Sequence, residues 1–433
     1  MRIGIDGSSI LPRRTGIGHY TNQLLRHLAL VDSQNQYVVF LNSFRHDMCR
    51  ESWMEHPNFT IRHRRIPGPV LLFAWRYFNR PAIEWLVGDV DVFHSPATYI
   101  PPQRRGVCVT TVHDLHFMRD PASCEMLGGR YLMATLPRRL KQMDRVIAAS
   151  QNTRTDLIEL LGAAPERITV VYEGVDSRFL EVGQVGNLSS SQTGSPRPVG
   201  QVGNLSEQAS SLLPAVRARH RLPDRYILFV GTIEPRKNVE RLIEAYALVR
   251  SARQDAPPLV IVGGRGKSAD RVEQAVASFG LSQWVVLAGY VNQDELSAIY
   301  RGADLFVLPS LYEGFGLPVL EAMACGVVVV AGDTSSLREL VGANRGILVD
   351  PMRPSQIAAG ILRALSDARL RAECIRRGLE FAREMTWERC ARQTLAVYEE
   401  IGQAADPPRT RTRSWGGIPL APTLSRRATC GHL

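Results

Sequence analysis

The chain alternates short apolar runs with stretches of helical periodicity, and this alternation occurs twice along its length. Continuous apolar runs between helices are typical of parallel sheets, because the crossover helices cover both faces. Six such runs in each half predict two doubly wound α/β domains. The expected strands are Ile3–Asp6, Tyr37–Leu41, Asp91–His94, Val107–Val112, Arg145–Ala149 and Ile168–Val171, then Tyr226–Val230, Leu259–Val262, Val285–Ala288, Leu305–Leu308, Val327–Ala331 and Gly346–Val349.

Helices are expected between these strands, with a linker between the two domains. Residues 182–213 are rich in Gly, Ser, Gln and Pro and contain a direct repeat, Val182–Ser189 and Val199–Ser206. Two copies are too few for a solenoid, so a flexible insertion is favoured over a partner-binding segment. The expected helices are about 18–30, 72–86, 152–161, 239–250 and 293–301. The expected divisions are an N-terminal domain over 1–181, a linker over 182–219, a C-terminal domain over 220–385, a crossing helix over 386–405 and a tail over 406–433.

The positive charge is unevenly distributed. The formal net charge is +10, and residues 406–433 hold five Arg and one Asp, which makes +4 of that total. This tail lacks apolar periodicity, so we expect it to be disordered and basic. The folded part is only mildly basic, which argues against nucleic acid as a partner.

The sequence is typical of a cytoplasmic protein. It begins with an expected strand and has no early apolar stretch of the signal-peptide kind. No run approaches the roughly 18 apolar residues of a membrane-spanning helix. Its seven Cys are dispersed without a C-x-x-C pair, which favours reduced thiols.

Two glycines follow the first expected strand, in Arg14-Thr15-Gly16-Ile17-Gly18. Glycines here let backbone N–H groups approach an anion at a helix start. The motif is not a full G-x-G-x-x-G, and no acidic residue ends the next strand, which disfavours a dinucleotide dehydrogenase. A phosphate site and a tight turn without a ligand both stay open.

His113 and Asp114 follow the strand Val107–Val112. They would lie at the carboxyl edge of the sheet, where open α/β sheets bind ligands. His113 can donate to a substrate or stabilise developing charge. A packed or capping histidine is the alternative.

Arg236 and Lys237 lie in Gly231–Asn238, between a strand and a helix. Cations at a helix start do not stabilise the helix, since they favour its other end. A bound diphosphate would explain them. Solvated surface charge is the alternative.

The most specific motif is Pro309–Gly326, a Gly-rich turn before a helix that begins near Leu317. Glu313 in the turn can accept from sugar hydroxyls, and Glu321 can hold a ribose diol. The glycines of Gly314–Gly316 leave backbone N–H groups open to phosphate. A Glu at a helix start also stabilises that helix by about 0.3–1 kcal/mol, which accounts for Glu313 but not for the turn.

Asp89-Val90-Asp91 could hold a divalent metal, but it precedes its strand and so lies at the wrong edge of the sheet. The sequence contains no H-E-x-x-H, Walker lysine loop or G-x-S-x-G. We therefore expect no metal site.

These motifs resemble the retaining GT-B glycosyltransferases of family 4, the glycosyl transferases group 1. The resemblance covers about residues 1–181 and 220–402, and its strongest marker is the Glu-x7-Glu element. Trp387 and the segment after it resemble the family's final helix, which crosses back to the N-terminal lobe. Further support comes from the Gly16 loop, Val92–Pro96, His113-Asp114, Tyr172–Asp176, Gly231–Lys237 and Ala303–Ser310.

The resemblance implies a nucleotide-diphosphate-sugar donor, held mainly by the C-terminal lobe, with no cofactor and no metal. Lys237 and Arg236 would neutralise the leaving diphosphate, and His113 would face the donor sugar near the reacting carbon. Glu313 would hold hydroxyls of the donor sugar, and Glu321 would hold the ribose. The backbone amides expected at the diphosphate are those of Gly314, Phe315, Gly316 and Leu317, with Gly16 from the other lobe.

The nearest subgroup resembles bacterial mannosyltransferases of surface polysaccharide assembly, which implies GDP-mannose and a glycan or lipid-linked acceptor. Val328 stands where the family often has Pro, and Thr232 where some members have Arg. These departures and the 182–213 insertion bear on donor orientation and domain closure. The alternatives are a nucleotide-sugar isomerase or hydrolase on the same fold, and a non-catalytic basic binding protein.

Arg62–Arg65, followed by Leu71–Trp75, could touch the anionic inner face of a membrane. The alternative is a helix packed on the sheet, as in the family.

Overall fold

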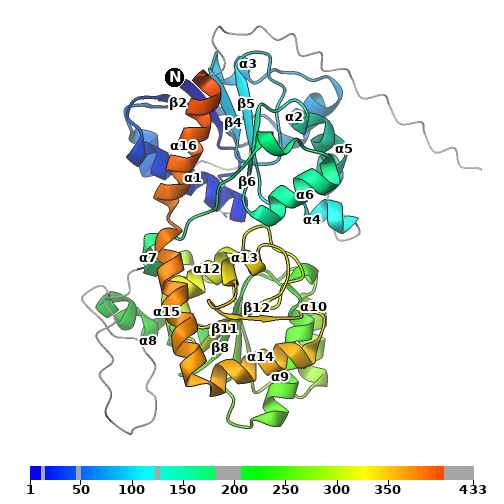
Figure 1. Cartoon of the computed structure of the whole chain (residues 1–433), viewed down its shortest axis with the longest axis vertical. Helices are drawn as coiled ribbons and strands as arrows, with labels where there is room; N and C mark the ends of the chain where they lie inside the picture. The colour runs from blue at the N-terminus through cyan, green and yellow to red at the C-terminus, as the bar shows by residue number, and fades with distance from the viewer. Residues whose placement is uncertain (11–14, 45–49, 122–126, 181–205, 404–433) are drawn as a thin grey trace, which may run out of the picture.

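The computed structural model describes residues 1–10, 15–44, 50–121, 127–180 and 206–403. Within these ranges the chain forms two lobes, each a parallel sheet flanked by helices (Figure 1). This arrangement confirms the two predicted doubly wound α/β domains.

The N-terminal sheet has seven parallel strands in the order β3-β2-β1-β4-β5-β6-β7. The prediction of six strands was wrong by one, because the edge strand β3 has no continuous apolar run. Its burial alternates, and Thr60, Arg62 and Arg64 are exposed. The strands are β1 (Arg2–Asp6), β2 (Gln36–Asn42), β3 (Phe59–Arg64), β4 (Val92–Ser95), β5 (Val107–Val112), β6 (Arg145–Ala148) and β7 (Ile168–Val170).

The C-terminal sheet has the six predicted strands, all parallel, in the order β10-β9-β8-β11-β12-β13. Its four central strands are buried at every position, as expected where helices cover both faces. The strands are β8 (Ile227–Val230), β9 (Leu259–Val262), β10 (Val285–Gly289), β11 (Leu305–Leu308), β12 (Val329–Gly332) and β13 (Ile347–Val349).

The two faces of the N-terminal sheet are covered by different helices. In β2, Tyr37, Val39 and Leu41 pack in the core beneath α1 and α16, whereas Val38 and Phe40 pack beneath α2 and α3. The helices up to residue 180 are α1 (Gly16–Val31), η1 (Ser52–Glu55), α2 (Gly68–Tyr77), α3 (Glu84–Val87), α4 (His116–Arg119), α5 (Leu127–Leu140), α6 (Gln151–Leu161), η3 (Pro165–Arg167) and α7 (Ser177–Leu180), and the last of them packs on the C-terminal lobe. Those that follow are α8 (Ser206–His220), η4 (Pro235–Lys237), α9 (Val239–Ala252), α10 (Ala269–Ser278), α11 (Gln293–Arg301), α12 (Leu317–Ala324), α13 (Leu337–Val341), α14 (Pro354–Ser366), α15 (Ala368–Glu384) and α16 (Trp387–Gln403).

The expected helix over 72–86 is two helices, α2 and α3, so that prediction was wrong in its extent. The first ends at Tyr77, and Asn79 has a positive φ of 56°. Pro81, four residues after that end, has no N–H for a helical hydrogen bond.

The last helix returns to the N-terminal lobe, as predicted. Figure 1 shows α15 along the C-terminal lobe and α16 beside α1 in the other lobe. Trp387 is buried against the rings of His19 and Tyr20, and the hydroxyl of Tyr398 lies 2.6 Å from Nδ1 of His94. A Cβ at Gly174 would lie 2.2 Å from the Trp387 nitrogen, so the crossing requires glycine there.

The range that the sequence assigns to a linker, 182–219, is partly helical, because α8 begins at Ser206 and packs against α11. The rest of that range, to 205, and the basic tail from Asp406 lie outside the described residues. No helix in the described part of the chain is both long and apolar enough to span a bilayer.

Candidate active site

The loops that follow β5 and β11 meet between the lobes. A Cβ at Gly314 would lie 2.4 Å from the carbonyl oxygen of His113 and 2.9 Å from Cβ of Asp114. Position 314 must therefore be glycine for the loops to approach this closely. Both loops leave the carboxyl ends of parallel strands, which is the edge where such sheets bind ligands.

A buried ion cluster occupies the C-terminal side of this junction. Oε1 of Glu313 lies 2.6 Å from Nζ of Lys237, and Oε2 lies 2.8 Å from Nη1 of Arg236. Burial alone would raise the pKa of Glu313, but the two cations outweigh burial and lower that pKa to about 2. The three charges sum to +1, and the nearby carboxylate of Asp114 also acts electrostatically on both cations.

The loop that carries the two cations is held in place by the residue after them. Asn238 has a left-handed backbone conformation, with φ of 61°, between η4 and α9. Its Nδ2 donates to the carbonyls of Pro309 and Pro351, at 3.0 and 2.6 Å. The backbone of Arg236 also accepts from the Leu311 amide at 2.8 Å, so the loops after β8 and β11 are tied together.

The turn after Glu313 leads directly into α12. Gly316 has a φ of 107°, which favours glycine, and α12 begins at Leu317 as predicted. Ser336 Oγ donates to the carbonyls of Glu313 and Phe315, at 2.9 and 2.7 Å. Those carbonyls are thereby turned toward α13, and the helix start can present its amides to an anion.

Glu321 lies on α12, where the Tyr300 hydroxyl donates to its Oε2 at 2.8 Å. Burial raises the pKa of Glu321 to about 7, although the hydrogen bond from Tyr300 opposes this shift. Glu321 is therefore ionised only in part at neutral pH.

His113 is buried, and both of its ring nitrogens have partners in the protein. Nδ1 lies 2.9 Å from Oε1 of Glu173, and Nε2 lies 2.9 Å from the Pro96 carbonyl oxygen. Both partners are acceptors, so the doubly protonated ring satisfies both contacts. Burial would lower the pKa of His113, but Glu173 outweighs it and raises that pKa above its usual value. A side-chain hydrogen bond from His113 to a sugar would require one of these contacts to be exchanged.

Gly16 and Gly18, at the start of α1, have different surroundings. A Cβ at Gly18 would lie 2.4 Å from the Ser9 carbonyl, so Gly18 is needed for packing. A Cβ at Gly16 would meet no atom within 4 Å, so the space around Gly16 is open. Arg14 of the motif lies outside the described residues.

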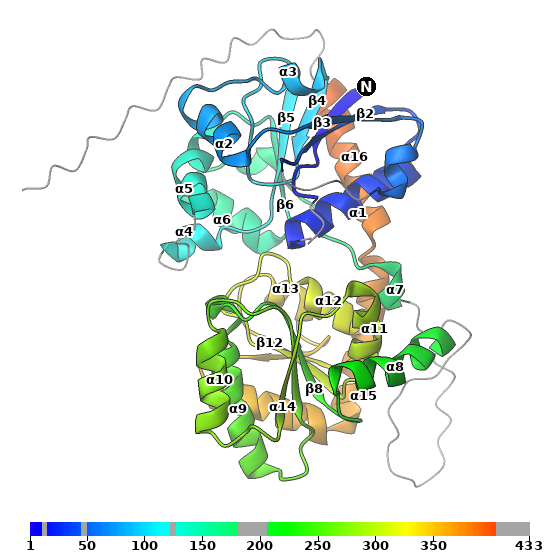
Figure 2. The same ribbon diagram turned by 180° about the vertical axis from the view of Figure 1, so that it is seen from behind.

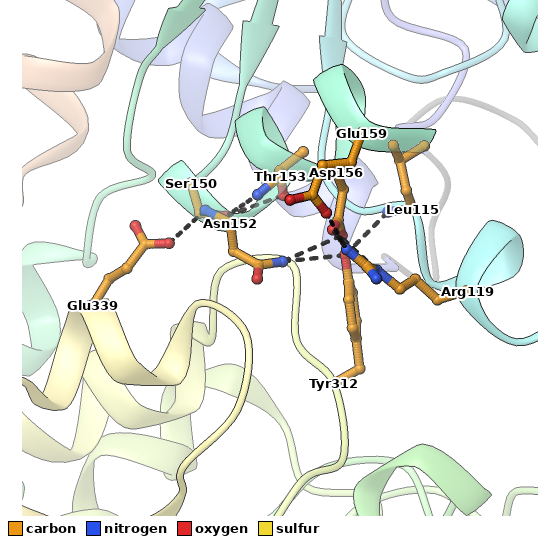
Figure 3. A network of polar contacts seen from close by, with 9 residues as sticks. All are labelled: Leu115, Arg119, Ser150, Asn152, Thr153, Asp156, Glu159, Tyr312 and Glu339. Atoms are coloured by element: carbon orange, nitrogen blue, oxygen red, sulfur yellow. Dashed lines mark hydrogen bonds and ion pairs between the residues drawn. The ribbon is translucent and has the colours of Figure 1, made fainter. Parts of the chain in front are cut away.

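Tyr312, next to Glu313, joins the lobes (Figure 3). Its hydroxyl donates to Oδ2 of Asp156 at 2.6 Å and accepts from Nδ2 of Asn152 at 3.4 Å. Asp156 is buried and is also bound by Arg119, whose Nε lies 3.0 Å from its Oδ1.

Glu339 on α13 makes a second connection, to the start of α6 (Figure 3). Its carboxylate accepts from the amides of Gln151 and Asn152, at 2.9 and 2.6 Å, and from the Tyr172 hydroxyl at 3.0 Å. A carboxylate at a helix N-terminus is stabilising, because the first amides have no partner within the helix. Tyr312 and Glu339, which we call the interlobe pair, hold the lobes together in this structure.

The structure thus brings most of the predicted residues to one junction, and it adds four that sequence reasoning assigned no role: Glu173, Tyr312, Glu339 and Asp156. Glu173 and Tyr312 lie within or beside motifs already singled out. Their partners are distant in sequence, by 60 residues for His113–Glu173 and 156 for Asp156–Tyr312, so no local pattern pointed to them.

Comparison with known proteins finds matches to both lobes of the chain. Residues 215–381 match the family model "Glycosyl transferases group 1", and residues 14–179 match "Glycosyltransferase Family 4". The chain is 30% identical over 392 residues to O-antigen chain mannosyltransferase B of Escherichia coli, which covers 89% of this chain and 96% of that protein.

Solved structures share the fold. Sucrose-phosphate synthase from Thermosynechococcus elongatus gives a TM-score of 0.70 at 21% identity, over 93% of this chain and all of that one. HepE from Anabaena, in complex with UDP and glucose, gives 0.62 at 18% identity, over 92% of this chain and all of that one. Two facing lobes with a returning final helix define the GT-B class of fold. The chain belongs to the group 1 glycosyltransferases, family 4.

Tyr312→Phe removes the hydroxyl of the interlobe pair and keeps the ring. A hydrogen bond to a charged group contributes about 1.5–3 kcal/mol, so open forms should become more populated by a factor on the order of ten to a hundred. Small-angle X-ray scattering should then give a larger radius of gyration. Tyr226→Phe is the control, since it removes a buried bond to the Ile299 carbonyl within one lobe. An unchanged radius in Tyr312→Phe would contradict the role of this contact.

Glu173→Gln should lower the pKa of His113 below its usual value, because burial persists and the attracting charge is lost. Histidine NMR titration measures the shift, and Glu166→Gln, at an exposed position, is the control. The raised pKa stabilises the fold fully below about pH 6.5, and this stability is lost as pH rises through the folded pKa. The difference in unfolding free energy between wild type and Glu173→Gln should therefore be largest in acid. Equal pKa values of His113 in both proteins would rule out this pairing.

Proposed function

We propose that this glycosyltransferase moves mannose from GDP-mannose to a glycan or lipid-linked acceptor in surface polysaccharide synthesis, with retention of configuration. It would act on the cytoplasmic side of the inner membrane. The observation that carries the proposal is the buried ion cluster of Glu313, Lys237 and Arg236 at the junction between the lobes. The choice of mannose rests on the similarity to the Escherichia coli mannosyltransferase.

In this proposal the two cations bind the diphosphate of the donor. Lys237 is buried, so its charge is poorly screened by water and acts strongly on a phosphate at contact distance. Amides of Gly314, Phe315, Gly316 and Leu317 complete the diphosphate site, with Gly16 approaching from the open space at the start of α1. Glu321 holds the ribose hydroxyls.

Glu313 holds the hydroxyls of the sugar. A carboxylate with a pKa of about 2 is a weak proton acceptor, so Glu313 is poorly suited to deprotonate the acceptor. The leaving phosphate is the better base in this site. The bond between the anomeric carbon and the diphosphate oxygen breaks, a bond to the acceptor oxygen forms on the same face, and the acceptor proton passes to the phosphate.

His113 would then act through its charge and position. Its imidazolium, held between Glu173 and Pro96, lies on the N-terminal side of the junction. A fixed cation beside the bound donor stabilises the negative charge that develops on the leaving group, without reorganisation during the reaction.

The proposal is tested with a panel of GDP- and UDP-sugars, measuring both thermal shift and transfer to an acceptor. GDP-mannose should give the largest stabilisation and turnover. Lys237→Ala and Glu313→Ala should each lower transfer by orders of magnitude while the protein stays folded by circular dichroism. Lys141→Ala, at an exposed site between α5 and β6, is the matched control. Free sugar or an epimer as the only product would favour the hydrolase or isomerase, and near-normal turnover by either variant would exclude the assigned site.

The affinity for the donor should rise with pH through about 7. The ionised form of Glu321 accepts two hydroxyl hydrogen bonds, whereas protonation removes one acceptor. The KM for the donor should therefore fall between pH 6 and 8, in the range set by the pKa of about 7. Tyr300→Phe removes a bond that lowers this pKa and should move the transition to higher pH. Tyr246→Phe, which loses a bond to Pro257, is the control. A KM that does not vary with pH would contradict this role of Glu321.

A further inference from the structure

Helix α2 is apolar on the side that faces away from the protein as well as on the side that faces the core. Leu71 and Trp75 are buried in the core beneath the sheet. Val70 and Phe73 on the helix and Phe78 directly after it are 58%, 55% and 65% exposed. An outward apolar surface on a helix that already has a buried face is not explained by packing against the residues that the structure describes.

The aromatic rings on this side of α2 form a group. The centroid of Phe73 lies 4.7 Å from that of Tyr77 and 5.9 Å from that of Phe78. Trp85, on the next helix, is 63% exposed, and the guanidinium of Arg104 lies over it at 6.0 Å. We call Val70, Phe73, Tyr77 and Phe78 the α2 face. Figure 2 shows α2 on the side of the upper lobe away from α16, and α3 at the top of that lobe.

The segment that carries this face is strongly cationic. Residues 56–83 contain five Arg and no Asp or Glu. Arg62, Arg64 and Arg80 are exposed, and the first two point to the same side of the edge strand β3, because they are two residues apart. The apolar surface is therefore accompanied by positive charge without a neighbouring carboxylate in that segment.

This combination distinguishes among possible partners. Nucleic acid would account for the arginines but not for exposed Val and Phe side chains. The boundary of a bilayer accounts for both, because apolar and aromatic side chains enter the acyl region while arginines reach anionic headgroups. We propose that the α2 face and the arginines of β3 dock the enzyme on an anionic lipid surface.

The position of this surface fits the proposed reaction. This argument from position rests on the proposed function, whereas the docking surface itself does not. Arg64 ends β3, and His113 follows β5, so both lie at the carboxyl edge of one parallel sheet. The order β3-β2-β1-β4-β5 separates them by four strand spacings, roughly 19 Å. A docked enzyme would therefore present its interlobe junction beside the bilayer, where a lipid-linked acceptor is anchored.

The test is flotation of the full chain with vesicles of phosphatidylcholine, with and without about 30% phosphatidylglycerol. Wild type should bind the anionic vesicles and bind pure phosphatidylcholine far more weakly, with binding reduced by added salt. Phe73→Ser/Phe78→Ser and Arg62→Glu/Arg64→Glu should each lower the fraction bound by roughly tenfold or more. All four positions are exposed, so these variants should stay folded.

Matched controls are Phe279→Ser, an exposed aromatic on the C-terminal lobe, and Arg167→Glu/Arg369→Glu, two exposed arginines elsewhere. The basic tail is present in every variant, so a loss confined to the test variants is assigned to the α2 face. Transfer to a water-soluble acceptor should be unchanged, which separates this proposal from the proposed function. Equal vesicle binding by the test variants and wild type would overturn the docking surface. The proposal would also be overturned if Arg62→Glu/Arg64→Glu lost binding to nucleic acid but kept its binding to anionic vesicles.

Discussion

The direction of the strands is the constraint on which the rest of the structure depends. Because every strand in each sheet is parallel to its neighbours, every loop that follows a strand emerges at the same edge. The loops after β5, β8 and β11 come from distant parts of the chain, yet they meet at one junction. The returning helix α16 and the interlobe pair hold those two edges against each other.

The electrostatics of the junction follow from this meeting of loops. Glu313 from the loop after β11 makes ion pairs with two cations from the loop after β8, so the buried charges of Glu313 and Lys237 are paired. A buried pair is costly to desolvate and is tolerated where its geometry is good. In the proposed function the two cations bind the donor diphosphate, and the low pKa of Glu313 would suit that carboxylate to binding hydroxyls more than to transferring protons.

The N-terminal lobe has a packed interior and, on one side, an outward surface that is apolar and basic. One face of its sheet is sealed by α1 and α16, and the other by α2, α3 and α5. The second group includes a helix whose outward side is apolar and whose neighbouring edge strand is basic. Arg64, at the end of that edge strand, lies at the same carboxyl edge of the sheet as His113.

Much of the fold and of the candidate site could be read from the sequence, because both depend on local patterns. Apolar runs located twelve strands, the Gly-rich turn located the start of α12, and the motifs singled out Glu313, Arg236 and Lys237, which the structure joins in one cluster. The edge strand β3 was missed because one of its sides is exposed and polar, and α2 and α3 were merged because helical periodicity continues across the break.

The tertiary structure alone decided the partners of the charged groups. His113 pairs with Glu173, Tyr312 with Asp156, and Glu339 with the start of α6, and each contact joins segments far apart in the chain. Local patterns depend on neighbouring residues, so the sequence determined which residue types reach the junction. Which of them meet depends on how two sheets and a crossing helix pack, and only the folded chain specifies that packing.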